Sequence, residues 1–445
     1  MFPTWVVCSI FVSYVYVVYG YQPLTSRQLR SESDRNAAKV NYSQFGNVES
    51  YSGYLLTDSS HKTKLFYWFF PAKVNKNTAP IILCLQGGPK TSNLKMLFFE
   101  NGPFKIVDQD NVAIRDNSWI EHSSLLYIDS PAGVGYSTTT ADAAVSILLV
   151  SSRLRGALNH FFIIFDNYKT NDIYLYGEEY SALYAIQLAK QLQSDLPTNL
   201  KGIMIANGLV DPARQIVYSD HLYYMGVISD KVKDEISALE TTLKSNLNAK
   251  NWTSADATYN QIFEKIKTKA GYNSLANIDY TDDQNAQLKT ALEKFLNKND
   301  VKTALHVANN QFKLSTEMTT LFTDHYESKS SMVGDLLQNY KVLFLHGNLD
   351  LKHSYSSLIS YIEDLPYSSI QTYKDSTRQK LCLGDDVAAY IKKGENLNEA
   401  MVRNAGMHAA MDQPGYVSEL VKRFVNKQTL WTVPDADGKI SCVPS

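Results

Sequence analysis

The sequence predicts an α/β fold in which a mostly parallel sheet is covered by helices and interrupted by a helical insertion. Two patterns support this prediction. Short apolar runs alternate with amphipathic helical patterns over most of the 445 residues, and one long internal stretch has helical patterns without a clear strand. The composition, with 44% apolar and 20% charged residues, is that of an ordinary globular protein that can bury a large core.

Six short apolar runs predict the buried strands of this sheet, and most of them end at Gly, Asn or Asp. The runs are residues 64–70, 81–85, 124–128, 173–176, 202–206 and 342–345. Residues 180–193, between two of these strands, predict a helix, because Leu183, Ile186 and Ala189 recur along one side.

The pattern changes from about residue 213 to residue 337, where Glu, Lys, Asn and Thr interrupt the periodic apolar positions. We expect a helical insertion there, with helices over residues 232–247, 259–270 and 285–296. The predicted organisation is a main domain in two parts, 21–212 and 338–445, with the insertion 213–337 between them.

The first twenty residues predict a secretory signal. From Trp5 to Tyr19 the chain is apolar or aromatic apart from two serines. No basic residue precedes this run, so a non-cleaved anchor stays open, although the run is short for a bilayer span. Sequons for N-glycosylation begin at Asn41 and Asn251. We expect a secreted protein, extracellular or lysosomal, with no stable membrane insertion and an oligomeric state that the sequence leaves open.

The cysteines allow at most one bridge in the mature chain. Cys8 lies in the predicted signal, which leaves Cys84, Cys382 and Cys442. Cys84 falls in an apolar strand and is expected to be buried and unreactive. A bridge between Cys382 and Cys442 is one pairing that the sequence leaves open.

The charge balance excludes polyanionic partners. The 43 Lys and Arg residues face 45 Asp and Glu residues, for a formal charge of -2. Such a chain has no field that holds nucleic acid or an anionic membrane surface.

The segment Ile173–Ser181 predicts a strand, a tight turn and the start of a helix. In such a nucleophile elbow, the residue two positions after the first Gly of the turn is exposed at the carboxyl edge of the sheet. The next backbone N–H points to a developing oxyanion. Here the turn begins at Gly177, the exposed residue is Glu179, and the oxyanion donor is the N–H of Tyr180.

Motifs in fixed order extend over nearly the whole chain. They are Leu85-Gln-Gly-Gly-Pro89, Leu97-Phe-Phe-Glu-Asn-Gly-Pro103, Asp129-Ser-Pro-Ala-Gly-Val-Gly135, Asn207-Gly-Leu-Val-Asp-Pro212, His346-Gly-Asn-Leu-Asp350 and Asp412-Gln-Pro414. With these motifs the chain resembles the serine carboxypeptidases, including their vitellogenic and lysosomal protective protein branches. The resemblance implies an α/β-hydrolase fold, with a second oxyanion donor at Gly88.

The resemblance also implies a catalytic triad, and here the triad is degenerate. Family members attack with Ser, use His as the base and orient the His with Asp. Asp350 matches the Asp, but Glu179 replaces the Ser. Met407 holds the position of the His, and His408 lies one residue later. Loss of the nucleophile typically lowers turnover about a millionfold, and loss of the His adds little. We therefore expect an inactive peptidase that binds a peptide C-terminus or a protein ligand.

The site for the substrate carboxylate is partly retained in this resemblance. Glu100 and Glu178 match two acids that share a proton, Gln86 replaces an Asn, and Cys84 replaces a Trp. Neither a metal nor a cofactor is expected.

Several alternatives stay open. One alternative is that Ser181 acts as a substitute nucleophile. The other interpretation of Ser181 is a Ser in the first turn of the helix. A second alternative is that Glu179 attacks saturated carbon as the nucleophile and forms an ester, which a water activated by His408 then cleaves. His346, His353 and Asp350 form a metal site only if the turn brings them together. At the level of the whole protein, the alternatives are an active carboxypeptidase at acid pH and a non-catalytic storage protein.

Overall fold

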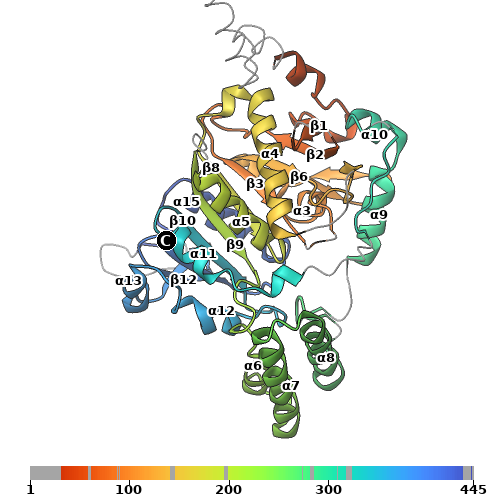
Figure 1. Cartoon of the computed structure of the whole chain (residues 1–445). Helices are drawn as coiled ribbons and strands as arrows, with labels where there is room; N and C mark the ends of the chain where they lie inside the picture. Colours follow the sequence, from red (N-terminus) through yellow and green to blue (C-terminus); the bar gives the residue numbers. More distant parts are fainter. Residues whose placement is uncertain are drawn as a thin grey trace, which may run out of the picture.

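The structure, a computed structural model, describes residues 32–58, 62–87, 89, 91–140, 146–194, 199–272, 274–280, 285–307, 309–316, 323–433 and 442. Within these residues, eleven strands form one sheet in the order β1-β2-β6-β3-β8-β9-β10-β13-β12-β11, with β7 paired to β2 (Figure 1). The strands are β1 (Tyr51–Leu56), β2 (Thr63–Phe70), β3 (Ile81–Leu85), β6 (Ser124–Ile128), β7 (Thr138–Thr139), β8 (Ile173–Glu178), β9 (Leu200–Ala206), β10 (Lys341–Gly347), β11 (Gln379–Leu383), β12 (Asp386–Lys393) and β13 (Leu397–Val402). A separate hairpin pairs β4 (Phe104–Ile106) with β5 (Val112–Ile114).

The centre of the sheet is parallel and its edges are antiparallel. Neighbouring strands from β6 through β3, β8, β9 and β10 to β13 are parallel, whereas β1, β2, β11 and β12 add antiparallel pairs. The chain therefore has the α/β-hydrolase fold that the sequence predicts, and all six predicted strands are confirmed within a few residues. The carboxyl ends of β3, β8, β9 and β10 share one edge, and the motif residues follow these ends.

The helices of the described residues either lie on the two faces of the sheet or project from the body of the molecule (Figure 1). They are α3 (Leu94–Met96), α4 (Ile147–Ile164), α5 (Ser181–Ser194), α6 (Tyr218–Tyr224), α7 (Asp230–Asn248), α8 (Trp252–Ala270), α9 (Ala286–Leu296), α10 (Asn299–Ala304), α11 (Ser330–Leu337), α12 (Tyr355–Ile362), α13 (Ile370–Asp375), α14 (Ala409–Asp412) and α15 (Pro414–Val425). Side chains of β3 alternate between two core clusters, with Ile81 and Leu83 in one and Ile82 and Cys84 in the other. The first cluster includes residues of α4, α5, α11 and α12, and the second includes residues of α9 and α15.

The helices between β9 and β10 do not share one core. α6, α7 and α8 project from the body of the molecule and form a third cluster around Ile236, Leu243 and Ile262 (Figure 1). α9 and α11 instead pack into the two clusters of the sheet. Among the described residues of this range no strand is present, as the sequence predicts. The domain boundaries at residues 213 and 337 stay a prediction.

The structure decides the cysteine pairing that the sequence leaves open and confirms that Cys84 is buried. Cys382 and Cys442 form a disulfide, and Cys84 is buried with its pKa raised by that burial. The sequon residues Asn41 and Asn251 are exposed, so glycosylation there stays a prediction. The predicted signal, residues 1–20, lies outside the described residues.

One described helix, α4, is long and apolar enough to cross a membrane. Half of it is buried within the molecule, where Val150, Leu154 and Phe161 belong to the core.

Candidate active site

The nucleophile elbow is present at the end of β8. Glu179 lies between β8 and α5 with a φ of 56°, a left-handed conformation that non-glycine residues seldom adopt. Its backbone N–H donates to the Ala206 carbonyl at 2.9 Å. A Cβ at Gly177 would lie 2.7 Å from the Ala182 Cα and 2.8 Å from the Ala185 Cβ. Glycine thus allows the helix to return tightly over the strand, and the turn presents Glu179 at the carboxyl edge.

An ion pair holds the Glu179 side chain. Its Oε1 lies 2.7 Å from the Nζ of Lys352, and the two side chains are 22% and 32% exposed. Burial opposes ionisation of Glu179, but the Lys352 ammonium outweighs it and lowers the pKa of the carboxyl to about 2. Glu179 is therefore a carboxylate whose charge is neutralised by Lys352.

Asp350 is bonded to amides and not to an imidazole. The side chain is buried and accepts hydrogen bonds from Asn207 Nδ2 at 2.7 Å and from the backbone N–H groups of Lys352 and His353 at 2.8 and 3.1 Å. Burial raises its pKa to about 7, although these bonds favour the ionised form.

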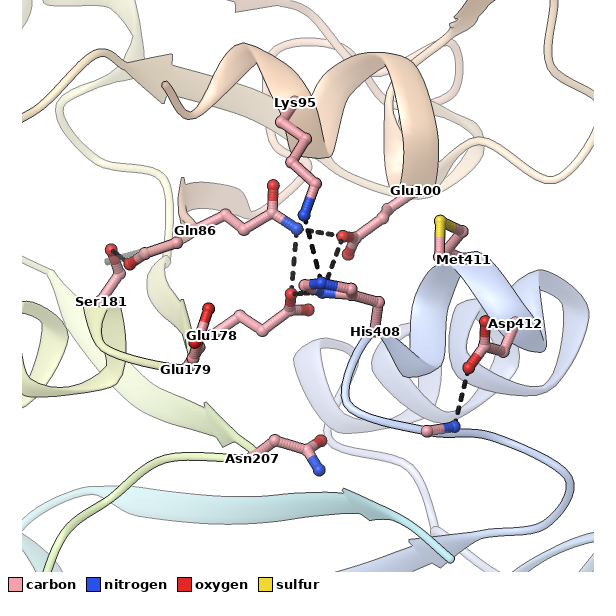
Figure 2. A network of polar contacts seen from close by, with 12 residues as sticks. Gln86, Lys95, Glu100, Glu178, Glu179, Ser181, Asn207, His408, Met411 and Asp412 are labelled. Carbon is pink, nitrogen blue, oxygen red and sulfur yellow. Dashed lines mark hydrogen bonds and ion pairs between the residues drawn. The ribbon is translucent and has the colours of Figure 1, made fainter. Parts of the chain in front are cut away.

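His408 points into the pocket of acids behind the elbow (Figure 2). Its Nδ1 lies 2.5 Å from Glu178 Oε1 and 3.5 Å from Glu100 Oε1, and its Nε2 lies 3.1 Å from Lys95 Nζ. An ammonium has no lone pair, so Nε2 accepts from Lys95 and Nδ1 donates to Glu178. Both ring nitrogens are thus engaged, and neither is directed to Asp350 or Glu179.

The two acids in this pocket have opposite pKa shifts. Burial and the charge of Glu178 raise the pKa of Glu100 well above its usual value. Burial also acts on Glu178, but His408 and the Gln86 amide outweigh it and lower the pKa. Gln86 Nε2 donates to Glu100 and, at 2.9 Å, to Glu178. The Gln86 amide therefore bridges two carboxyl groups whose pKa values are shifted in opposite directions.

A cleft of about 490 Å³ lies over the elbow. Its inner wall includes Glu179, Lys352, Lys95 and His408, and its outer wall comes from α8 and the segment that follows α8. A ligand in this cleft would contact both the elbow and the insertion.

Most of the chain matches known proteins. A family model described as "Serine carboxypeptidase" matches residues 41–427. The chain belongs to the serine carboxypeptidase family. It is 30% identical over 410 residues to the venom serine carboxypeptidase of Apis mellifera, with 88% of each chain covered. It is 31% identical over 417 residues to the vitellogenic carboxypeptidase of Aedes aegypti, covering 90% of this chain and 88% of that one.

A solved structure supports the fold alone. The prohormone-processing carboxypeptidase Kex1(delta)p from Saccharomyces cerevisiae superimposes with a TM-score of 0.78 at 19% identity. The match covers 91% of this chain and 98% of that chain.

Compared with the triad of the serine carboxypeptidase family, the three positions here are not connected. Glu179 pairs with Lys352, Asp350 pairs with Asn207, and His408 pairs with Glu178 and Lys95. The loop before His408 is held by the insertion, because Met407 N donates to the Ala276 carbonyl at 2.7 Å. The chemistry that this arrangement offers is charge and hydrogen bonding.

The serine carboxypeptidase oxyanion hole is only partly described. Tyr180 follows Glu179 at the expected position, whereas Gly88 lies outside the described residues, so the hole stays a prediction. Ser181 is 1% exposed and donates through Oγ to the Gly87 carbonyl at 2.7 Å. This bond supports the interpretation of Ser181 as a helix-start residue.

The alternative metal site around Asp350 is not formed. Among the described residues, one group of three His, Cys, Asp or Glu residues brings ligand atoms within 4.8 Å of one another, and its members are Glu100, Glu178 and His408. His346 and His353 are buried, and their pKa values are lowered to about 3 chiefly by burial.

Sequence reasoning missed both lysines. Lys352 follows Asp350 by two residues. Because the Asp350 turn is expected near the elbow, a basic residue in this turn was a signal for a partner of Glu179. Lys95 lies five residues before Glu100, a spacing with no motif that indicates a contact with His408.

Proposed function

We propose that this serine carboxypeptidase homologue is a secreted protein that binds a peptide or protein ligand through its cleft and does not hydrolyse it. The observation that carries the proposal is the 2.7 Å ion pair between Glu179 and Lys352 at the position of the nucleophile. A carboxylate neutralised by an ammonium is a poor nucleophile, and within the part of the chain that the structure describes no imidazole bonds to it.

The missing base supports the same conclusion. In this family the His takes the proton of the nucleophile and gives it to the leaving amine. Here His408 is committed to Glu178 and Lys95, and Met407 is buried in its place. Loss of nucleophile and base together lowers turnover by about a millionfold, which leaves binding as the role of the cleft.

The pocket of Gln86, Glu100 and Glu178 supports a ligand with a free carboxyl terminus. Burial and the charge of Glu178 favour the protonated form of Glu100, which can donate to a ligand carboxylate as an acid of a proton-sharing pair does. The Lys95 ammonium lines the cleft next to this pocket and adds a positive charge. Both features favour a C-terminal carboxylate over an amide.

Secretion is supported by the sequence and by the bridge. The apolar N-terminal run, the exposed sequon residues Asn41 and Asn251, and the disulfide between Cys382 and Cys442 are typical of secreted proteins. The name of the relative from Apis mellifera places that protein in venom.

Calorimetry with one peptide in two forms tests the proposal. The mature chain is titrated with a peptide bearing a free C-terminal carboxylate and with its C-terminal amide, and the peptides are then weighed by mass spectrometry. We expect saturable binding of the free acid, about tenfold or more weaker binding of the amide, and intact peptide in both cases. Shortened peptide contradicts the non-hydrolytic role, and equal or absent binding of both forms contradicts the binding role and favours a storage protein.

A further inference from the structure

The pocket behind Glu179 combines an imidazole with two carboxylates. Glu100, Glu178 and His408 each direct one ligand atom into a space in which these atoms lie within 4.8 Å of one another. The His408 Nδ1 lies 2.5 Å from Glu178 Oε1 and 3.5 Å from Glu100 Oε1. Imidazole and carboxylate together are ligands that Zn²⁺ and similar divalent ions accept in proteins.

Buried acceptors in the same pocket lack a partner. Glu100 Oε2 and Gln86 Oε1 are shielded from solvent, and neither has a hydrogen-bond partner in the structure. Their residues are 1% and 0% exposed. Buried polar atoms are nearly always satisfied, so these two unpartnered oxygens beside three metal-ligand side chains favour a cation as a ligand of this pocket, and its binding would displace the proton that burial favours on Glu100. A bidentate Glu100 would use its second oxygen, and rotation of the Gln86 amide would turn Oε1 into a fourth ligand.

In the structure, Gln86 and Lys95 take the place of such an ion: the Gln86 amide satisfies the carboxyl oxygens by hydrogen bonds, and the Lys95 ammonium supplies positive charge. The Gln86 amide donates to both carboxyls, and the Lys95 ammonium lies 3.1 Å from His408 Nε2 (Figure 2). Lys95 lines the cleft, so its long side chain has room to leave the pocket. When His408 ligates through Nδ1, its proton moves to Nε2, where it opposes Lys95. Lys95 therefore competes with a metal ion.

We propose that Glu100, Glu178 and His408 bind one divalent transition-metal ion, of which Zn²⁺ matches the ligand set best, in competition with Lys95. This inference goes beyond the proposed function and does not depend on peptide binding. The ion and the Lys95 ammonium are alternative ways to neutralise the same buried carboxylates.

Titration of the chelator-treated full mature chain with ZnCl₂ alone tests the inference. We expect one site per chain by calorimetry, with affinity lowered about tenfold or more in Glu100→Gln and in His408→Ala. Lys95→Met is expected to bind more tightly than the wild type. His306→Asn, a matched change of a histidine outside the pocket that keeps its left-handed backbone, is expected to leave the affinity unchanged. Co²⁺ in place of Zn²⁺ should give visible absorption bands that His408→Ala loses.

The outcomes separate this site from other zinc contacts. Absence of saturable Zn²⁺ binding by the wild type overturns the inference, and so does binding that His408→Ala and Glu100→Gln leave unchanged. His408 is partly exposed and Glu100→Gln keeps the shape of the side chain, so at least one variant is expected to fold, as circular dichroism checks. No peptide is present, and the result is independent of the peptide titration.

Discussion

At position 179 the elbow carries a carboxylate, and the Lys352 ammonium forms an ion pair with it. An isolated carboxylate at a half-buried turn would be desolvated without compensation. The ammonium 2.7 Å away offsets that cost and keeps Glu179 ionised. The pair therefore explains how the elbow accommodates an ionised Glu179.

Removal of one partner should destabilise the fold more than removal of both. Lys352→Met leaves Glu179 partly buried and unpaired, so we expect the free energy of unfolding to fall by about 1–3 kcal/mol. The double variant Glu179→Gln with Lys352→Met should recover most of this loss in chemical denaturation. Lys73→Met is the control: it breaks the surface pair with Glu121, whose side chains are 49% and 44% exposed, and should change stability by less than about 1 kcal/mol. Equal losses in Lys352→Met and the double variant would show that the pair contributes nothing.

Restoring the hydroxyl alone should not restore hydrolysis. In Glu179→Ser the ring nitrogens of His408 are still bonded to Glu178 and Lys95. We expect its release of a C-terminal residue from a blocked dipeptide to equal the wild-type background. The variant in which turnover should appear combines Glu179→Ser with Met407→His and His408→Met. Activity of the single variant would refute the assigned position of His408.

The positions of these residues could be predicted from the sequence, but their partners could not. The spacing from Gly177 to Glu179 and the ordered motifs identify the elbow, because turn chemistry is local. The pairing of Glu179 with Lys352 and the direction of the His408 ring depend on which side chains meet across three loops. Their interactions are set by tertiary placement, which no local pattern encodes.

At the scale of elements, the close contact between β8 and α5 creates the elbow. Gly177 has no room for a Cβ, since the Ala182 Cα would lie 2.7 Å away. The strand, the turn and the helix therefore form one tightly packed unit.

Gly177→Ala should push α5 away from the end of β8. The added methyl group meets backbone atoms that cannot rotate away, so we expect a loss of stability of about 1–3 kcal/mol or more. Gly415→Ala is the matched control, because its Cβ would meet only Leu383 Cδ2 at 3.9 Å within a helix, where Ala is favoured over Gly. Thermal unfolding of both variants measures the difference, and similar midpoints would contradict the tight packing of the elbow.

In the helical insertion, the positions of the helices could be predicted from the sequence, but their packing partners could not. The helices α7, α8 and α9 lie where the apolar period predicts them. The period cannot tell which core an amphipathic helix joins. α7 and α8 pack on each other, whereas α9 packs beside the sheet. The segment from Leu275 to Tyr280 then binds both the Asp350 turn and the Met407 loop, so the insertion helps to set the site.

At the scale of the whole molecule, a neutral buried histidine couples stability to pH. His346 lies in β10 with no exposure and no hydrogen-bond partner for either ring nitrogen, and burial lowers its pKa to about 3. In the unfolded chain the pKa is about 6.5. The folded state therefore excludes a proton that the unfolded state binds below pH 6.5. The neutral His346 therefore lowers stability only in acid: the free energy of unfolding is not reduced above pH 6.5 and falls as the pH decreases from 6.5 toward 3.

His346→Leu should flatten this dependence. Between pH 6.5 and pH 5 the wild type should lose about 1.6 kcal/mol more unfolding free energy than the variant, since the unfolded His is half protonated at pH 6.5 and the slope approaches about 1.4 kcal/mol per pH unit below it. Denaturation at several pH values measures both slopes, which makes the test independent of any constant change in stability. Parallel slopes would show that His346 does not stay neutral in the folded protein.

The most direct test of the central claim is peptide-bond turnover by the pure wild-type chain. A blocked dipeptide with a free C-terminus is incubated with the protein between pH 4 and pH 7, and the released residue is measured beside a His408→Ala control. The ion pair at Glu179 predicts no release above that of buffer at any of these pH values. Steady release by the wild type that His408→Ala abolishes would contradict the account.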